Sequence, residues 1–433
     1  MKQQAKLVCI NPKCGKTYPI RSLAIKCDSC DFLLDVKYEN KPNSNLKDIF
    51  YERRNPQGSI YNESGVWRFR ELLNFCEIET EDIEQCSKHL VSLDGAEGRQ
   101  SKPYHMSKVA EFVGINNENV VFQPEGYNPS GSFKDNGMSA AVTHGKMMGA
   151  KKIICASTGN TSASAGMFAA NENMDCDVYI PDGQIAPGKL SQAYQFGTQM
   201  LKVNGNFDDA FTKSLKAAEE PGSYTVNSVN PFRIEGQKTI PYRALEALDW
   251  EVPDWLVYPG GALGNTSSCG KRLMAVINAK GANTLYQLFN GIFDEEKLRW
   301  NDGAPNFELI ERFYKKMNDN EELKPKTKAT AIQIGKPSNI AKGLRALDFT
   351  DGIVEEVTDK EMLDGMSVVG LNGFDCEMAS GASVAGIKKL RDKGIIKKDD
   401  KVVGILTGRQ KEPLLPIDYH NDPANKFARP PKI

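Results

Sequence analysis

Residues 151–180, KKIICASTGNTSASAGMFAANENMDCDVYI, decide the fold class of this chain. An apolar run at 151–155 is followed by a turn-forming segment at 157–164 and a helical pattern over 165–173. A second short apolar run follows at 177–180. Strand, turn, helix and strand within thirty residues are typical of a βαβ unit, whose two strands pair in parallel.

The same alternation continues along the chain and predicts an α/β protein with helix-covered parallel sheets. The expected strands are 199–203, 224–226, 255–258 and 401–406. The expected helices are 186–196, 207–219 and 267–279. The charged stretch 295–328 reads as an inserted surface excursion.

Composition narrows the class of protein. The 433 residues carry 55 Lys and Arg against 56 Asp and Glu, a net charge of −1 that disfavours nucleic-acid binding. No run approaches the roughly 20 apolar residues of a membrane span, and the N-terminus lacks the apolar region of a signal peptide. We therefore expect a cytoplasmic enzyme with reduced thiols and no membrane partner.

The first forty residues read as a separate small unit. Cys9-x4-Cys14 and Cys27-x2-Cys30 form two paired knuckles, flanked by short extended runs at 6–8 and 32–36. Four thiolates are a complete tetrahedral set for one structural zinc ion, although a ribbon without metal stays open. The polar residues 40–64 resemble a linker. We assign no chemistry to most of the other six cysteines, and expect the four histidines to be structural or on the surface.

Three turns could carry chemistry, and each alone is a weak signal. Lys134 follows the turn-rich stretch 128–133, where a helix should begin. The turn 157–162 ends one strand and opens a helix, so its N–H groups and hydroxyls suit an anion. The loop 258–266, YPGGALGNT, lies between strand 255–258 and the expected helix, as a phosphate-binding loop does, but it is neither a Walker A nor a GxGxxG motif.

The order of these pieces resembles the fold-type II pyridoxal-phosphate enzymes, and several segments are closer still to the threonine synthase family. The supporting segments are NPSGSFKDNGM, ASTGNTSASAG, VNSVNPFRIEGQKT, PGGALGNTSSCGKRL, TAIQIGKPSNIAKGLRAL, CEMASGASVAGIKKL and ILTGRQKEP. The resemblance covers roughly residues 65–415. It implies a fold like that of the tryptophan synthase β chain, with two three-layer parallel-sheet domains. We expect a zinc-ribbon-like head at 1–42, a large domain at 43–140 and 233–433, and a small domain at 141–232.

The resemblance also implies which residues bind the cofactor pyridoxal 5′-phosphate. Lys134 would carry the cofactor and act as acid and base, because a desolvated lysine is neutral more readily. Asn160 would contact the cofactor's ring oxygen and Thr407 the pyridine nitrogen. The cofactor phosphate would lie on the loop formed by Gly261, Ala262, Leu263, Gly264 and Asn265.

The implied substrate is O-phospho-L-homoserine, which with water gives L-threonine and phosphate. Ser157, Thr158 and Thr161 would bind its α-carboxylate, and Asn227, Ser228 and Arg233 its phosphate. A pairing of Arg233 with Glu235 is the simpler alternative. The resemblance further implies a homodimer.

Three departures from the family pattern keep related activities open. Ala262 stands where the family commonly has Asn, Asn136 where many relatives have Arg, and Arg409 begins a segment that usually begins with His. A cysteate synthase or an amino-acid dehydratase on the same fold therefore remains an alternative. A catalytically dead relative or a zinc-ribbon interaction protein is disfavoured by the intact Lys134, Asn160, glycine loop and Thr407.

Overall fold

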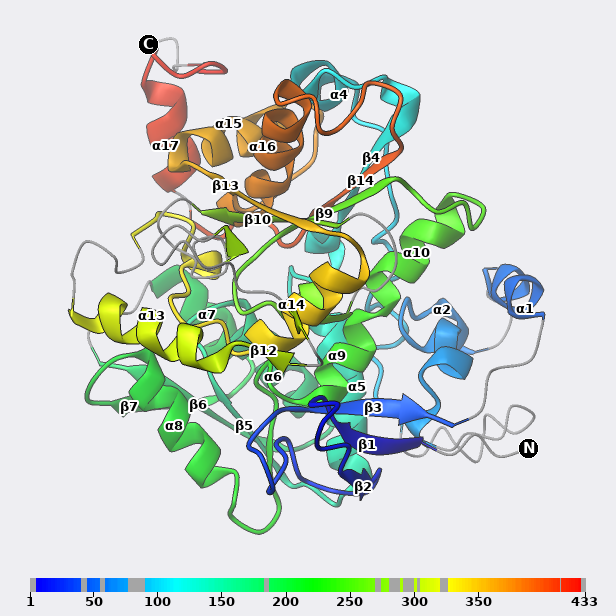
Figure 1. Ribbon diagram of the computed structural model, residues 1–433, viewed down its shortest axis with the longest axis vertical. Helices are drawn as coiled ribbons and strands as arrows, with labels where there is room; N and C mark the ends of the chain where they lie inside the picture. The colour runs from blue at the N-terminus through cyan, green and yellow to red at the C-terminus, as the bar shows by residue number, and fades with distance from the viewer. Residues whose placement is uncertain are drawn as a thin grey trace. The chain divides into compact units, whose positions relative to one another are not determined.

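The computed structural model describes most of the chain (Figure 1). The described residues are 5–39, 45–54, 59–76, 90–182, 187–268, 274–279, 289–290, 300–301, 304–319, 326–412 and 414–429. Contacts divide the chain into two units. The first unit comprises Met1–Gln100 with Asn128–Ile240, and the second comprises Ser101–Tyr127 with Pro241–Ile433.

The first unit is built on a parallel four-stranded sheet of order β7-β6-β5-β8. Its strands are β5 (Lys152–Ala156), β6 (Asp175–Pro181), β7 (Gln199–Val203) and β8 (Ser223–Thr225). The helices are α5 (Lys134–Met147), α6 (Asn160–Asn171), α7 (Pro187–Gln195), α8 (Phe207–Ala217) and α9 (Pro231–Gln237). Both α6 and α8 pack on β5 and β6. The βα units expected over 151–226 are thus confirmed.

A small antiparallel sheet of order β2-β1-β3 forms the N-terminal part of this unit. We call residues 5–39 the ribbon; its strands are β1 (Ala5–Cys9), β2 (Thr17–Pro19) and β3 (Leu34–Tyr38). Short helices follow it: α1 (Leu46–Arg53), α2 (Ile60–Glu63), η1 (Trp67–Leu72) and η2 (Asn74–Cys76). In Figure 1 the ribbon strands lie below α9, and β3 contacts that helix.

The second unit is built on a parallel five-stranded sheet of order β13-β10-β9-β14-β4. The strands are β4 (Val120–Pro124), β9 (Trp255–Pro259), β10 (Met274–Ala279), β13 (Ile353–Val357) and β14 (Val402–Leu406). The strands expected at 255–258 and 401–406 are confirmed.

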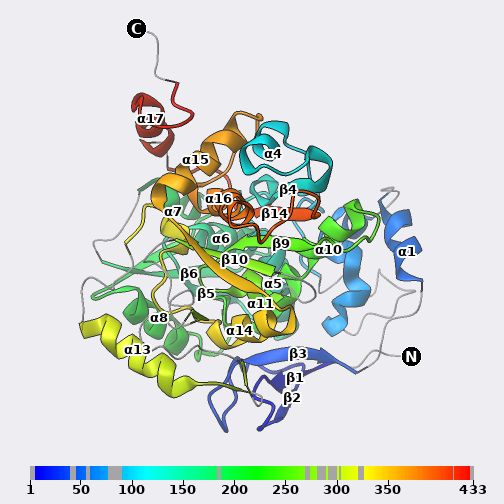
Figure 2. The same ribbon diagram turned by 45° about the horizontal axis from the view of Figure 1, so that its top comes forward.

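Further helices and short strands belong to the second unit. The elements are α4 (Ser107–Val113), η3 (Asn117–Asn119), η4 (Glu125–Tyr127), most of α10 (Thr239–Ala247), α11 (Gly264–Ser268), α13 (Phe307–Asp319), η6 (Thr330–Ile332), α14 (Ile340–Phe349), α15 (Asp359–Gly370), α16 (Met378–Asp392) and α17 (Leu414–Asn421), with the strands β11 (Trp300–Asn301) and β12 (Ala304–Pro305). Figure 2 shows α4, α15 and α16 gathered over the sheet, and buried residues of all three helices belong to the same core cluster as Phe122 and Val257.

Two expectations about local structure are wrong. The helix expected over 267–279 is instead α11, which ends at Ser268, and β10, a strand between β9 and β13. A run of six residues such as MAVINA does not reveal by period whether it is strand or helix, and here the parallel pairing of β10 with β9 on one side and β13 on the other decides. The expected linker 40–64 contains α1 and α2, and Phe50 of α1 is buried edge-on against Phe69, with ring centroids 5.0 Å apart.

The stretch 295–328 is not simply a surface excursion. Within its described part, α13 buries Leu309, Ile310, Phe313 and Met317 along one face. A charged sequence with this spacing is an amphipathic helix that packs one side. The domain bounds expected from sequence stay a prediction; residue 140 lies in the middle of α5, and α5 packs along α9.

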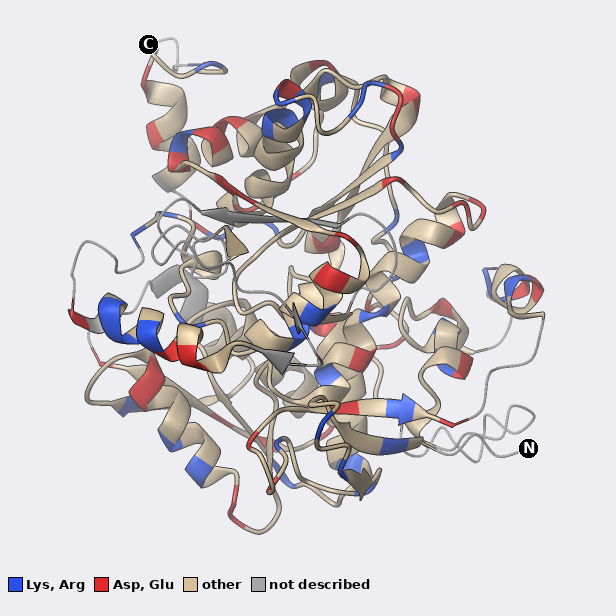
Figure 3. Ribbon diagram, in the orientation of Figure 1, with Lys and Arg blue, Asp and Glu red and all other residues tan. Residues whose placement is uncertain are grey.

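Acidic and basic residues are interspersed along the helices, as the colours of α8 and α13 show in Figure 3. Within the part of the chain that the structure describes, none of the helices has the length and apolar character required to span a membrane.

Candidate active site and cysteine cluster

The segment before α5 is held by Asp135, so that Lys134 begins the helix. Ser130 donates to the Asp135 carboxylate through its backbone N–H (2.8 Å) and its hydroxyl (2.5 Å), and Ser164 of α6 donates at 2.6 Å. Asp135 is fully buried, whereas Lys134 is half-buried with its Nζ 3.8 Å from the centre of the Phe133 ring. The lysine thus sits on a rigid turn, with its amine less enclosed than the carboxylate beside it.

The first turn of α5 lies backbone to backbone against α9. A Cβ on Gly236 would lie 2.0 Å from the carbonyl oxygen of Asn136, and one on Gly137 would lie 2.7 Å from the carbonyl oxygen of Arg233. Only glycine allows helices to approach this closely. The crossing brings the helix that carries Lys134 against the helix that carries Arg233.

Arg233 is 1% exposed, and part of its guanidinium has no hydrogen-bond partner among the described residues. Its Nη1 donates to the carbonyl of Val226 (2.7 Å), while its Nε and Nη2 have no hydrogen-bond partner among the described residues. Burial lowers the pKa of Arg233 to about 10, so the guanidinium keeps its charge at neutral pH. Glu235 instead accepts hydrogen bonds from Tyr38 and Lys238, so the alternative pairing of Arg233 with Glu235 is not formed.

The other two residues predicted for the substrate phosphate differ from Arg233. The side-chain amide of Asn227 bonds the backbone of Ala156 twice, accepting from its N–H and donating to its carbonyl, both at 2.9 Å. Asn227 therefore fixes the end of β5, and one of its N–H bonds is left for a ligand. Ser228 is half-buried on the turn between β8 and α9.

The turn after β5 leads into α6, whose N-terminus has no side-chain cap. Ser157, Thr158 and Thr161 are half-buried, and Asn160 is buried as the first residue of the helix. The Ser157 hydroxyl accepts the Gly159 N–H at 3.2 Å, and the Gly159 side of the helix makes no side-chain cap. The first N–H groups of an uncapped helix bind a carboxylate or phosphate well.

In the second unit, the loop after β9 is held closed by α14 and η6. The Asn339 N–H donates to the carbonyl of Ala262 (3.1 Å), and a Cβ on Gly261 would lie 3.3 Å from the carbonyl of Ala331. Leu263 has a left-handed φ of 64°. Thr266 Oγ1 is buried without a partner among the described residues, so this turn offers a hydroxyl that can donate to a phosphate.

Thr407, at the end of β14, lies beside a carboxylate that the sequence analysis missed. Its hydroxyl is 3.1 Å from Ser380 Oγ and 3.4 Å from Glu377 Oε1, and all three residues are buried. The Glu377 N–H also donates to the carbonyl of Gly408 at 2.8 Å. The segment CEMASGAS was recognised as a family-like stretch, but nothing local to it indicates a contact with a strand thirty residues later.

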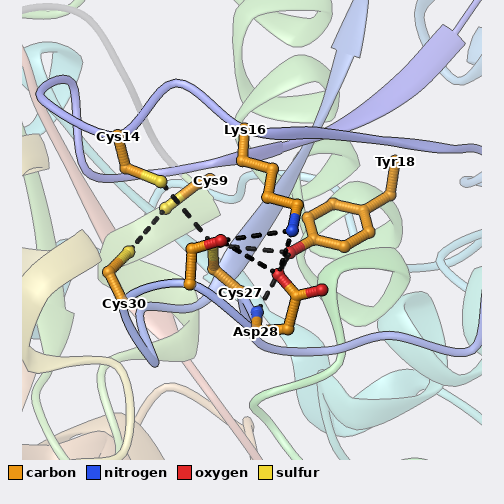
Figure 4. A network of polar contacts seen from close by, with 8 residues as sticks. Cys9, Cys14, Lys16, Tyr18, Cys27, Asp28 and Cys30 are labelled. Carbon is orange, nitrogen blue, oxygen red and sulfur yellow. Dashed lines mark hydrogen bonds and ion pairs between the residues drawn. The ribbon is translucent and has the colours of Figure 1, made fainter.

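Cys9, Cys14, Cys27 and Cys30 come together in the ribbon, as Figure 4 shows. Their Sγ atoms all lie within 4.8 Å of one another, with 3.4 Å between Cys9 and Cys30 and 3.7 Å between Cys14 and Cys27. Four sulfurs bound to one zinc at about 2.3 Å would be about 3.8 Å apart. The cluster therefore has the dimensions of a tetrahedral thiolate site.

Polar neighbours favour a thiolate at Cys27. Burial alone would raise the pKa of Cys27, but hydrogen bonds from the Tyr18 hydroxyl (3.4 Å), the Ser29 N–H and the neighbouring thiols lower it to about 6. Tyr18 in turn donates to Asp28 at 2.6 Å, and Lys16 lies 2.5 Å from the same carboxylate (Figure 4). Burial raises the pKa of Cys9, as expected where no metal charge offsets it.

The remaining cysteines and histidines show no other cluster within the described residues. Cys155, Cys176 and Cys376 are buried with pKa values raised by burial, as inert thiols should be, while Cys86, Cys269 and His89 lie outside the described residues. His144 is fully buried, the most enclosed of the described histidines.

A cavity of about 350 Å³ in the first unit does not coincide with these residues. It lies between ribbon residues 22–26, the end of α8, β8 and the start of α9. None of the predicted site residues lines it.

A family model described as "Pyridoxal-phosphate dependent enzyme" matches residues 103–408. Among curated proteins, the threonine synthase of Methanocaldococcus jannaschii is 37% identical over 95% of this chain and 94% of its own length. The threonine synthase of Methanosarcina acetivorans is 35% identical, over 96% of this chain and 95% of its own length.

Solved structures agree in fold. Threonine deaminase isoform 2 from Solanum lycopersicum aligns with a TM-score of 0.55 at 16% identity, covering 88% of this chain and 94% of that one. A fungal L-serine ammonia-lyase from Rhizomucor miehei aligns with a TM-score of 0.58 at 16% identity, covering 75% and 98%. The predicted fold-type II architecture, with parallel sheets covered by helices, is confirmed.

Proposed function

Because the chain belongs to the threonine synthase family of pyridoxal-phosphate dependent enzymes, we propose that it converts O-phospho-L-homoserine and water to L-threonine and phosphate. The buried Arg233 supports this substrate most strongly. Among the described residues this guanidinium has two unused donors and makes no ion pair within 4 Å, although the buried Asp135 carboxylate acts on it at longer range, and such a group can bind an external dianion. Arginine suits a phosphate because its planar fork donates two parallel charge-assisted hydrogen bonds.

The reaction requires proton transfer at the substrate's carbon atoms and binding of the phosphate that leaves. Pyridoxal phosphate, when bound, stabilises negative charge at Cα and then at Cβ of the substrate. Lys134 would hold the cofactor and then move protons at these carbons. Arg233 and Ser228 would bind the phosphate that leaves from Cγ, and water then adds at Cβ.

The other predicted residues suit the remaining groups. Ser157, Thr158 and Thr161 offer hydroxyls and helix N–H groups to the α-carboxylate, beside Asn160, which would meet the cofactor's ring oxygen. The loop 261–265 would hold the cofactor phosphate through its backbone N–H groups, and the unsatisfied Thr266 hydroxyl could donate to the same anion. Thr407 would face the pyridine nitrogen, with Glu377 behind it orienting the hydroxyl.

Product analysis tests the activity. The purified, cofactor-loaded enzyme should release threonine and phosphate in equal amounts from O-phospho-L-homoserine, and Lys134→Ala should release neither. O-phospho-L-serine with sulfite serves as a competing substrate pair. Consumption of that pair, with no threonine from O-phospho-L-homoserine, would assign the chain to a sister activity.

We also infer that Cys9, Cys14, Cys27 and Cys30 hold one structural zinc ion. The convergence of four sulfurs in a segment with little core of its own supports this, because metal binding then contributes directly to folding. Elemental analysis after gel filtration should give about one zinc per chain. Metal-free protein with a folded ribbon would instead make this a ribbon without metal.

We further propose a homodimer located in the cytoplasm, as the family resemblance implies. Light scattering during gel filtration should give twice the chain mass of 47.9 kDa. Fractionation of the source cells checks the location.

A further inference from the structure

The ribbon contacts α9 directly through Tyr38, the last residue of β3. The Tyr38 hydroxyl donates to Glu235 Oε2 at 2.5 Å, and Lys238 donates to the same oxygen at 2.5 Å. Lys238 Nζ also lies 5.1 Å from the centre of the Tyr38 ring. Glu235 is 5% exposed, so this is a largely dry attachment between the ribbon and the helix two residues after Arg233.

A second attachment reaches the other end of α9 through a chain of hydrogen bonds. The carbonyl of Ile20 in the ribbon lies 2.9 Å from His144 Nε2, and His144 Nδ1 lies 2.8 Å from the Tyr224 hydroxyl. Asn230 donates from Nδ2 to that hydroxyl at 2.9 Å. The Oδ1 of Asn230 accepts the N–H groups of Phe232 (2.8 Å) and Arg233 (3.4 Å), which caps α9.

One assignment of protons satisfies the whole chain. A carbonyl only accepts, so Nε2 of His144 carries the proton and Nδ1 accepts from Tyr224. The Tyr224 oxygen is then free to accept from Asn230. Burial lowers the pKa of His144 to about 4, in agreement with a neutral ring at neutral pH, and the ring stacks on Phe232 at 3.5 Å between centroids.

Arg233 lies between these two attachments, on a helix of only seven residues. Such a short helix has little stiffness of its own, and its orientation depends on tertiary contacts. The guanidinium requires defined directions to form two parallel bonds to a phosphate. A small rotation of α9 therefore changes the aim of Nε and Nη2.

We propose that the cysteine ribbon is a brace that orients α9, and that Tyr38 and His144 are positioning residues for recognition of the substrate phosphate by Arg233. This inference rests on the proposed function, in which Arg233 binds that phosphate. The ribbon acts on substrate binding through α9.

The test compares Tyr38→Phe and Tyr224→Phe with Glu39→Gln in the full-length, cofactor-loaded enzyme. Glu39 is the matched control, because it adjoins Tyr38 and makes an exposed ion pair with Lys6. Each Phe variant should raise both KM for O-phospho-L-homoserine and the inhibition constant of inorganic phosphate about threefold to tenfold, the effect of one lost hydrogen bond. The control should change neither value, and the visible spectrum of the cofactor should be the same in all variants.

A conservative variant separates positioning from simple stability. In Glu235→Gln the amide oxygen still accepts from Tyr38, so KM should rise less than in Tyr38→Phe. Variants that lower the melting temperature but leave KM and phosphate inhibition unchanged would overturn the proposal.

Direct binding separates this proposal from the proposed function. Calorimetric titration of the loaded enzyme with inorganic phosphate measures the anion site without turnover. Weaker phosphate binding in Tyr38→Phe supports the brace even if the wild-type enzyme makes no threonine. Equal phosphate binding in wild type and variant rejects the brace even if threonine is made.

Discussion

Arg233 is the residue whose chemistry is most open to test. Replacing it with lysine keeps a buried positive charge but loses the planar fork and the bond to the Val226 carbonyl. We expect kcat/KM for O-phospho-L-homoserine to fall about tenfold to a hundredfold in Arg233→Lys, the cost of a charged hydrogen bond in a dry site. The cofactor spectrum should not change. Unaltered kinetics would mean that the phosphate binds elsewhere.

His144 makes a prediction about pH and stability. Burial lowers the pKa of His144 to about 4 in the folded protein, although its hydrogen bond to the Ile20 carbonyl acts in the opposite direction. In the unfolded chain the pKa has its ordinary value of 6.5. The unfolded chain then binds more protons between these values, so the contribution is complete above pH 6.5 and is lost as the pH falls towards 4. At pH 5 the loss is about 2 kcal/mol.

Urea unfolding of wild type and His144→Gln at pH 8 and pH 5 measures this contribution. Glutamine can donate to the Ile20 carbonyl and accept from Tyr224, but it does not titrate. The stability difference between the two proteins should therefore narrow by about 2 kcal/mol at the lower pH. A constant difference would mean that His144 takes up no proton on unfolding in this range.

Among elements, the crossing of α5 and α9 is the most constrained. In Gly236→Ala the new methyl would meet the Asn136 carbonyl at 2.0 Å, so the two helices must separate. We expect a loss of several kcal/mol of stability, as for other overpacked sites, together with a weaker grip on substrate phosphate. Gly370→Ala in α15 is the control, because nothing lies within 4 Å of its Cβ position. Melting temperatures of the two variants should differ clearly, and equal values would contradict the crossing.

The local hydrophobic pattern predicts the βα units well, because about ten residues are enough to indicate whether a segment is a strand or a helix. The pattern fails where pairing with neighbouring strands decides the secondary structure, as in β10. It also fails where a polar stretch forms a helix that packs through one buried side chain, as α1 does through Phe50. For the site, motif order leads to Lys134, Arg233 and the glycine loop. It does not reveal Glu377 beside Thr407 or Tyr38 beside Glu235, since these contacts join residues 30 and 197 positions apart.

At the scale of the whole molecule, we expect that loss of the proposed zinc ion weakens substrate binding. In a variant with Cys27→Ser and Cys30→Ser, zinc should be lost, and KM for O-phospho-L-homoserine should rise at least as much as in Tyr38→Phe. The reason is that both ribbon attachments to α9 depend on a folded ribbon. Cys76→Ser, outside the cluster, is the control. Retention of zinc, or an unchanged KM after its loss, would contradict this prediction.

The bond between Tyr38 and Glu235 also has a consequence for how the protein is made. The two residues are 197 positions apart, and a ribosome adding about 5–20 residues per second needs about 10–40 s to reach the second after the first. During that time the ribbon has no helix to dock against, and its own cysteines are its main means of staying folded. Metal supply during synthesis should therefore govern the yield of folded enzyme more than the rate of each finished molecule.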